Sequence, residues 1–266
     1  MNNISMKYRL LLIGFVISFP FYGQTYGSHE IGFYLGAPSI QTDYGQRNNF
    51  MSNVGGNIGV GAGIIHYYQF SDYRYKWFQR GNFFSEHFKI RSEISYAQAD
   101  LQHFGIWVDP SHTSVEADKL RAMHGSTSII NMGSQLEFHI RDLVDYGLRY
   151  YKWNYSPYVG LGLQVNVYKP TVISDYGTAD WKQNPTILPY KWSLPGAVNE
   201  KRGTTFSITL NAGSRIAIGE YSDIFIDTRW HYFMSNYVDG LNAKVDENKY
   251  NDWMLLFQFG YIYYLE

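Results

Sequence analysis

One segment of the sequence gathers the residue types that acyl transfer requires. Such a reaction needs a hydroxyl nucleophile, a histidine base and a carboxylate that orients the base. Between residues 101 and 124 the chain carries these types at five positions: His103, Asp109, Ser111, His112 and His124. This composition makes a lipid-modifying enzyme, with His112 as its base, one hypothesis for the protein.

The spacing of these residues matches no catalytic or metal-binding motif. No two histidines lie four residues apart, as they would on a metal-binding helix, and the chain has no cysteine. Polar residues are also expected in any exposed loop. We therefore interpret 101–124 as a solvated loop, and the sequence predicts no catalytic residue, no metal ligand and no cofactor.

A second set of polar residues alternates with apolar ones. In the segment 88–96, for example, Ile90 and Ile94 alternate with Arg91 and Glu93. The charged members of such segments are three acids and three bases: Arg91, Glu93, Glu137, Arg215, Asp227 and Arg229. Because buried charges must be paired, and because side chains fill a barrel of about eight strands, we predict a structural charge network in a closed lumen. A small channel is the alternative.

Eight segments have the two-residue period of half-buried strands. They are 31–36, 58–64, 88–96, 130–140, 159–167, 206–218, 224–232 and 253–265. Most of them reach the roughly 9 to 11 residues that a tilted membrane strand needs. The sequence therefore predicts an all-β fold, a transmembrane antiparallel β-barrel of about eight strands, with a soluble secreted β-barrel or sandwich as the competing interpretation.

The connections between these segments predict the orientation of the barrel. If the mature N-terminus lies in the periplasm, the ranges 38–56, 101–124, 170–203 and 237–251 fall outside the cell. The ranges 71–83, 141–156 and 219–223 then fall on the periplasmic side. Long outer loops and very short periplasmic turns are typical of bacterial outer-membrane barrels, and two of these periplasmic ranges, 71–83 and 141–156, are longer than that pattern predicts.

Two of the periplasmic connections combine aromatic and basic residues. The residues concerned are Tyr73, Tyr75, Trp77, Phe78, Arg80, Arg149, Tyr151 and Trp153. Tyr, Trp, Lys and Arg anchor proteins at the membrane interface, and aromatic residues and Arg are also enriched in binding hot spots. Both interpretations stay open, interfacial anchoring and a docking surface for a periplasmic partner.

The composition and the N-terminal segment fit an exported barrel. Aromatic residues make up 18% of the chain, as expected for aromatic girdles at both interfaces, and a net charge of -1 argues against a nucleic-acid partner. Lys7 and Arg9 precede the apolar run 10–21, which is typical of a secretory signal peptide. We predict a signal peptide over 1–24, with its boundary between 23 and 27, and a barrel domain over 25–266 in the lipid of the cell outer membrane.

Four stretches of the mature chain resemble the PorG-like outer-membrane barrels of gliding and type IX secreting bacteria. They are His29-Glu30-Ile31-Gly32 with Gly36, the run 156–162, the run from Asp227 and Arg229 to 237–240, and Asn251-Asp252-Trp253. The chain departs from the family pattern at 37–45 and at Ser235-Asn236. The resemblance implies a non-enzymatic barrel that contacts periplasmic lipoproteins or ring proteins of a type IX secretion or gliding apparatus.

Overall fold

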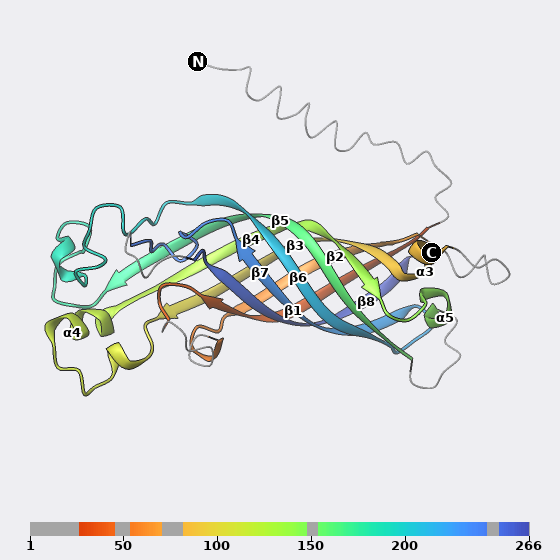
Figure 1. Ribbon diagram of the computed structural model, residues 1–266, viewed down its shortest axis with the longest axis horizontal. Helices are drawn as coiled ribbons and strands as arrows, with labels where there is room; N and C mark the ends of the chain where they lie inside the picture. The colour runs from red at the N-terminus through yellow and green to blue at the C-terminus, as the bar shows by residue number, and fades with distance from the viewer. Residues whose placement is uncertain (1–26, 46–53, 71–81, 148–153, 244–249, 266) are drawn as a thin grey trace, which may run out of the picture.

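The computed structural model describes residues 27–45, 54–70, 82–147, 154–243 and 250–265. Within these residues, eight antiparallel strands form a closed barrel (Figure 1). The strands are β1 (Ser28–Gln41), β2 (Val60–Gln69), β3 (Phe88–Gln102), β4 (Met123–His139), β5 (Tyr155–Ser174), β6 (Gly203–Ala217), β7 (Ser222–Phe233) and β8 (Trp253–Leu265). The prediction of an antiparallel barrel of about eight strands is confirmed.

The first and last strands close the barrel along one continuous seam. β1 pairs with β8 from His29 opposite Leu265 to Gln41 opposite Trp253. Each strand therefore has a hydrogen-bonded neighbour on both sides, and the barrel has no free sheet edge among the described strands. Closure of this kind satisfies the backbone polar groups that a bilayer cannot hydrate.

Short helices lie at both ends of the barrel. Figure 1 shows α3 (Phe83–His87) and α5 (Leu143–Gly147) near the end of the chain, which we call the terminal end. α4 (Val115–Ala122) lies at the opposite end, among the long connections, which we call the loop end. The loop end also carries the 3-10 helices η1 (Ile106–Val108) and η2 (Pro185–Ile187).

None of the helices that the structure describes is long and apolar enough to cross a membrane.

The two faces of the barrel wall differ in polarity. Outward side chains at mid-height are mostly apolar and exposed, as for Ile94 at 51%, Met132 at 59% and Leu163 at 67%, with the hydrogen-bonded pair Ser92 and Ser134 as an exception. Inward side chains on the same strands, β3 and β4, include Arg91 and Glu137, which are fully buried. A soluble barrel would bury the apolar set instead, so this arrangement identifies a barrel whose outer face contacts lipid.

This polarity reverses toward the loop end of β3, β4 and β5. On β3, Ile90 and Ile94 face outward, whereas Ala97 and Leu101 face inward further along the strand. Apart from Ile173 of β5, the outward residues beyond the reversal are polar: Gln98, Asp100 and Gln102 on β3, Ser128, Ser126 and His124 on β4, and Lys169 and Thr171 on β5. These strands therefore leave the lipid and continue into water.

The reversal lies at one level across the three strands. Tyr96 of β3 pairs with Ile130 of β4, and Ile130 pairs with Val167 of β5. These are the last outward apolar residues before the polar stretches, so we take this row as the boundary of the apolar band, with Tyr96 as an interfacial aromatic residue.

The reversal explains why several predicted strands stop short of the observed ones. The segment 159–167 was predicted for β5, which in fact extends to Ser174, and residues 101–102 and 170–174, predicted as loop, lie in strands. His124, also predicted in a loop, lies in β4. Beyond the boundary row the apolar residues change faces, so a search for one continuous two-residue period ends there.

Candidate functional site

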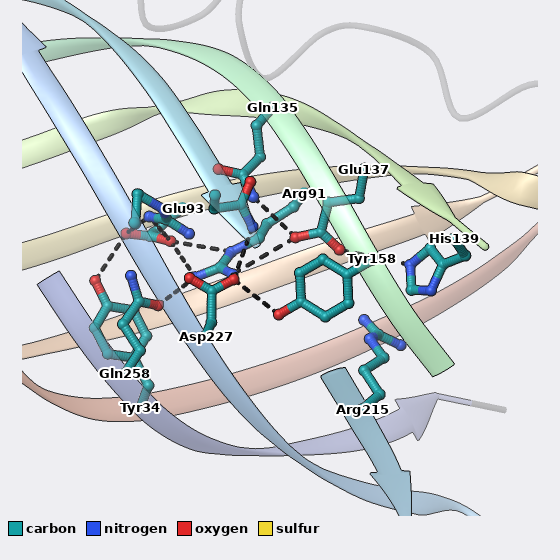
Figure 2. A network of polar contacts seen from close by, with 12 residues as sticks. Tyr34, Arg91, Glu93, Gln135, Glu137, His139, Tyr158, Arg215, Asp227 and Gln258 are labelled. Atoms are coloured by element: carbon teal, nitrogen blue, oxygen red, sulfur yellow. Dashed lines mark hydrogen bonds and ion pairs between the residues drawn. The ribbon is translucent and has the colours of Figure 1, made fainter. Parts of the chain in front are cut away.

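The six charged residues predicted for the lumen all point into the barrel. Arg91, Glu93, Glu137, Arg215, Asp227 and Arg229 are each at most 6% exposed. They belong to β3, β4, β6 and β7, where each follows an outward neighbour in the alternating pattern. The structure brings five of them together at the centre of the lumen and places Arg215 nearer the terminal end (Figure 2).

Glu93 is the centre of this charge network. Its Oε2 accepts hydrogen bonds from Arg91 Nη2 at 2.7 Å and from Arg229 Nη1 at 2.7 Å. Its Oε1 accepts from the Tyr34 hydroxyl at 2.8 Å (Figure 2). Two guanidinium groups therefore share one carboxylate, and bonds of this charge-assisted type are stronger than those between neutral groups.

Arg91 extends the network to two further carboxylates. Its Nη1 lies 3.5 Å from Glu137 Oε1 and 3.6 Å from Asp227 Oδ2. Asp227 Oδ2 also accepts hydrogen bonds from the hydroxyl of Tyr158 at 2.8 Å and from the amide of Asn211 at 2.7 Å. Side chains from strands on opposite sides of the barrel are thereby joined across the lumen.

A second ion-pair cluster surrounds Arg215. Arg215 Nη1 lies 2.6 Å from Glu30 Oε2 and 3.9 Å from Asp223 Oδ2, while Lys89 Nζ lies 2.5 Å from Glu30 Oε1. The ring of Tyr67 lies between the two clusters, 4.1 Å from the Arg215 guanidinium carbon and 5.8 Å from that of Arg91. All of these side chains are buried.

Three members of the second cluster were missed in the sequence. Lys89 lies between Phe88 and Ile90, two residues before Arg91 in the same alternating segment. The alternation that predicted an inward Arg91 therefore also predicts an inward Lys89. Glu30 and Asp223 stand at the beginning of their strands, where alternation is short and a charged residue resembles part of a turn. Their role depends on closure of the barrel, which sequence spacing alone does not show.

The loop end of the interior is filled in a different way. The loops there fold over the barrel and bury an apolar cluster, which we call the cap: Tyr44, Leu188, Trp192, Val238 and Leu241. Each of the five is at most 3% exposed. Backbone hydrogen bonds join two loops of the cap, from Asn199 to Gly240 at 2.8 Å and from Asn242 to Ala197 at 2.8 Å.

Similar solved structures are outer-membrane proteins of low sequence identity. A major outer-membrane protein of Thermus thermophilus aligns with a TM-score of 0.47 and 10% identity, over 89% of this chain and 99% of that one. Neisserial surface protein A gives 0.44 and 12%, over 89% and 97%. Ail, the attachment invasion locus protein of Yersinia pestis, crystallised with the heparin analogue sucrose octasulfate, gives 0.42 and 10%, over 90% and 99%.

No protein-family model matches the chain, and no curated protein matches it either. The assignment as a membrane barrel therefore rests on the chain's own features, namely the closed strand pairing, the exposed apolar band and the buried charges.

The structure separates the residues considered for acyl transfer. His103 is half-buried against the cap, with its ring 4.7 Å from that of Tyr44 and 6.5 Å from that of Trp192. His124 faces outward from β4, and its Nδ1 lies 3.8 Å from Asp175. Because His103 lies in the cap and His124 on the outer wall, these two do not join the others in one site.

The other three lie together on an exposed loop. Asp109 Oδ1 accepts a hydrogen bond from the backbone of Ser111 at 2.8 Å, and the His112 ring lies 5.9 Å from that of Trp107. Among the described residues, no hydrogen bond joins the His112 ring to either neighbour. The arrangement is a loop turn, without the base and nucleophile contact that acyl transfer needs.

Burial shifts the pKa of several groups in and around the cap. Burial, together with the nearby Lys191 ammonium, lowers the pKa of the His103 imidazole to about 3. Burial also raises the pKa of the Asp239 and Asp252 carboxyls well above the usual range. Within the part of the chain that the structure describes, no group of three or more His, Cys, Asp or Glu side chains is arranged to hold a metal ion.

The predicted partner surface lies outside the described residues. This applies to all eight of its members, Tyr73, Tyr75, Trp77, Phe78, Arg80, Arg149, Tyr151 and Trp153, and equally to the predicted signal peptide over 1–24.

Proposed function

We propose that this protein is a non-enzymatic β-barrel of the bacterial outer membrane that acts as a structural or interaction component and conducts no solute. The observation that carries this proposal is the filled interior. Ion pairs join opposite walls in one half of the lumen, and buried loop residues close the other half. A barrel of about eight strands is just wide enough for its own side chains to fill.

Conductance in planar bilayers tests the sealed interior. We expect the purified protein, inserted at a known density, to add no stable current steps at either polarity. A large-barrel porin inserted by the same procedure is the positive control. Steps whose number follows the amount of inserted protein would replace this proposal with the small-channel alternative.

We further propose that the barrel is exported by its signal peptide and contacts periplasmic proteins through the segments around Trp77 and Trp153. The clustering of aromatic and basic residues in these segments supports a protein-binding surface. The resemblance to PorG-like barrels suggests lipoproteins or ring proteins of a type IX secretion or gliding apparatus as the partners.

Photo-crosslinking in living cells tests this contact. A photoreactive amino acid replaces Trp77 or Trp153 in separate strains, and Tyr190, which is 72% exposed at the loop end, is the matched control position. We expect adducts with a periplasmic protein from positions 77 and 153 and none of that mass from position 190. Adducts with lipid alone at positions 77 and 153 would contradict the partner proposal.

A further inference from the structure

Two histidines on the outside of the barrel are used by neither the charge network nor the cap. His29 of β1 and His66 of β2 face outward near the terminal end. The His29 Nδ1 lies 3.0 Å from the His66 Nε2, and the ring centroids are 5.2 Å apart. Their surroundings are aromatic, with the ring of Tyr68 5.2 Å from that of His29.

The barrel holds the two imidazoles in this relation. Ile31 pairs with His66 and His29 pairs with Tyr68, so the histidines occupy diagonal positions on adjacent strands. β1 is also fixed from its other side, because His29 pairs with Leu265 of β8. The backbone positions that carry the two rings are therefore set by pairing on both sides of β1, and only side-chain rotation is free.

The spacing of the two nitrogens suits metal coordination. Neutral imidazole binds first-row divalent metal ions with metal–nitrogen distances of about 2.0 to 2.1 Å. Two such bonds at a right angle place their nitrogens roughly 2.9 Å apart, which is the separation of adjacent ligands in a tetragonal site of the kind that Cu²⁺ prefers. The observed separation is 3.0 Å.

We propose that His29 and His66 form a two-histidine binding site for a divalent transition-metal ion, with Cu²⁺ bound most tightly. The two protein ligands occupy adjacent positions, and water completes the coordination shell. Among divalent first-row ions Cu²⁺ binds nitrogen ligands most strongly, so Zn²⁺ and Ni²⁺ bind the same pair with lower affinity. The bound ion joins β1 to β2 at the terminal end.

The protons in this step balance without an additional reactant. In the hydrogen-bonded pair of neutral rings, one of the two facing nitrogens carries a hydrogen. On metal binding, that hydrogen moves through water to the other nitrogen of the same ring. Each ring then donates one lone pair to the metal, and the pair keeps the same number of protons.

The other histidines offer no equivalent pair among the described residues. Of the eight in the chain, His87 has its Nδ1 2.8 Å from the carbonyl oxygen of His139, His139 and His231 are buried, and His103 packs half-buried against the ring of Tyr44. His112 and His124 are accessible, but each stands alone among histidines. There is also no cysteine to compete for the ion. His112 and His124 therefore provide matched controls for nonspecific binding by a single imidazole.

Metal titration of the untagged protein in phosphatidylcholine nanodiscs tests the site. Isothermal calorimetry with Cu²⁺ and with Zn²⁺, after subtraction of empty nanodiscs, is expected to show one equivalent of specific binding. His29→Ala and His66→Ala should each weaken Cu²⁺ binding at least tenfold, whereas His112→Ala and His124→Ala should leave it unchanged. Electron paramagnetic resonance of the Cu²⁺ complex should show two equatorial nitrogens in the wild type and fewer than two in His66→Ala.

Folding of the variants is checked by their heat-dependent shift in gel mobility, which reports a closed barrel. Wild-type affinity in both His29→Ala and His66→Ala would overturn the proposal, as would loss of binding in His124→Ala with retention in His66→Ala. A wild-type spectrum with a single nitrogen ligand would also overturn it.

Discussion

The two halves of the barrel interior differ in the contacts that dominate them, although buried apolar residues such as Ile65 and Phe225 also line the ion-pair half. Toward the terminal end the wall presents apolar residues to lipid, and its inside holds buried ion pairs such as that of Arg229 with Glu93. Toward the loop end, β3, β4 and β5 present mainly polar residues to water, and the inside holds apolar residues such as Leu101 and Leu241. The switch occurs at the row through Tyr96 and Ile130.

This difference shows which interactions stabilise each half of the barrel. Where lipid surrounds the wall, there is little hydrophobic gain in moving apolar side chains inward, so directional bonds between charged groups join the strands instead. Where water surrounds the wall, burial of apolar side chains is again favourable, and the loops form a conventional core. Substitutions in the two halves should therefore differ both in the type of effect and in the size of their effect on stability.

Removal of Glu93 should produce the largest effect. Glu93→Ala leaves the guanidinium groups of Arg91 and Arg229 buried without their shared carboxylate, which should cost about 3 to 5 kcal/mol of unfolding free energy. Urea unfolding of the barrel refolded in lipid vesicles measures this cost. Glu116→Ala, which removes a half-exposed carboxylate at the loop end, should cost no more than about 1 kcal/mol. Equal effects would mean that the network contributes little to stability.

A charge on the outer wall should be costly only on the lipid side of the boundary row. Leu136→Arg places a cation in the apolar band and should destabilise the barrel by about 2 to 4 kcal/mol. Ser128→Arg lies on the same strand and the same face, beyond Ile130, and should change stability by no more than about 0.5 kcal/mol. The same vesicle unfolding experiment compares the two, and similar costs would show that the apolar band does not end at this row.

Truncation in the cap should loosen the loops without opening the barrel. Leu188→Ala removes a buried side chain that is 1% exposed, and we expect a local cost of about 2 kcal/mol. Hydrogen exchange followed by mass spectrometry should show faster exchange in the range 187–198 and unchanged exchange in β3 and β4. Faster exchange throughout the strands would indicate that cap and barrel unfold as one unit.

Mild acid should destabilise the cap through His103. Because burial lowers the pKa of His103 to about 3 from its usual value of 6.5, the open cap binds a proton more readily than the closed one below pH 6.5. The contribution of His103 is therefore complete above pH 6.5 and is lost progressively toward pH 3. The raised pKa values of Asp239 and Asp252 act in the opposite direction, stabilising the closed cap as the pH falls.

Comparison with His103→Leu separates these two contributions, because both proteins retain the two aspartates. Exchange in the range 187–198, corrected for intrinsic rates, should increase from pH 7 to pH 5 more in the wild type than in His103→Leu. An equal pH response in the two proteins would exclude His103 as its source.

The sequence predicted those parts of the fold that follow from a constant two-residue period. The centres of all eight strands and the inward direction of residues such as Arg91 and Glu137 follow from alternation within the apolar band. The extensions of β3, β4 and β5 did not, because the apolar residues change faces at the boundary row. For Val167 and Tyr168 on β5, two adjacent apolar residues mark this change.

Sequence patterns also could not predict the contacts between strands that are distant in the chain. Arg215 was predicted as a lumen residue, but its partner Glu30, which also pairs with Lys89, lies on a strand that reaches Arg215 only after the sheet curves into a barrel. The pairing of His29 with His66 depends on register, and the burial of His103 depends on how the loops fold over the barrel. Each depends on tertiary geometry, whereas alternation is a local property.

The seam between β1 and β8 also sets the order of events during assembly. Glu30 and Arg215 are 185 residues apart in the chain, and contacts of such high sequence separation form slowly because a long loop must close first. Until β1 meets β8, Glu30 on the first strand has no enclosed lumen in which to meet Arg215. Closure therefore completes the ion pairs and the backbone pairing in one late step, so reopening must break both together. Because both sets of contacts must break together, we expect unfolding of the finished barrel to be slow.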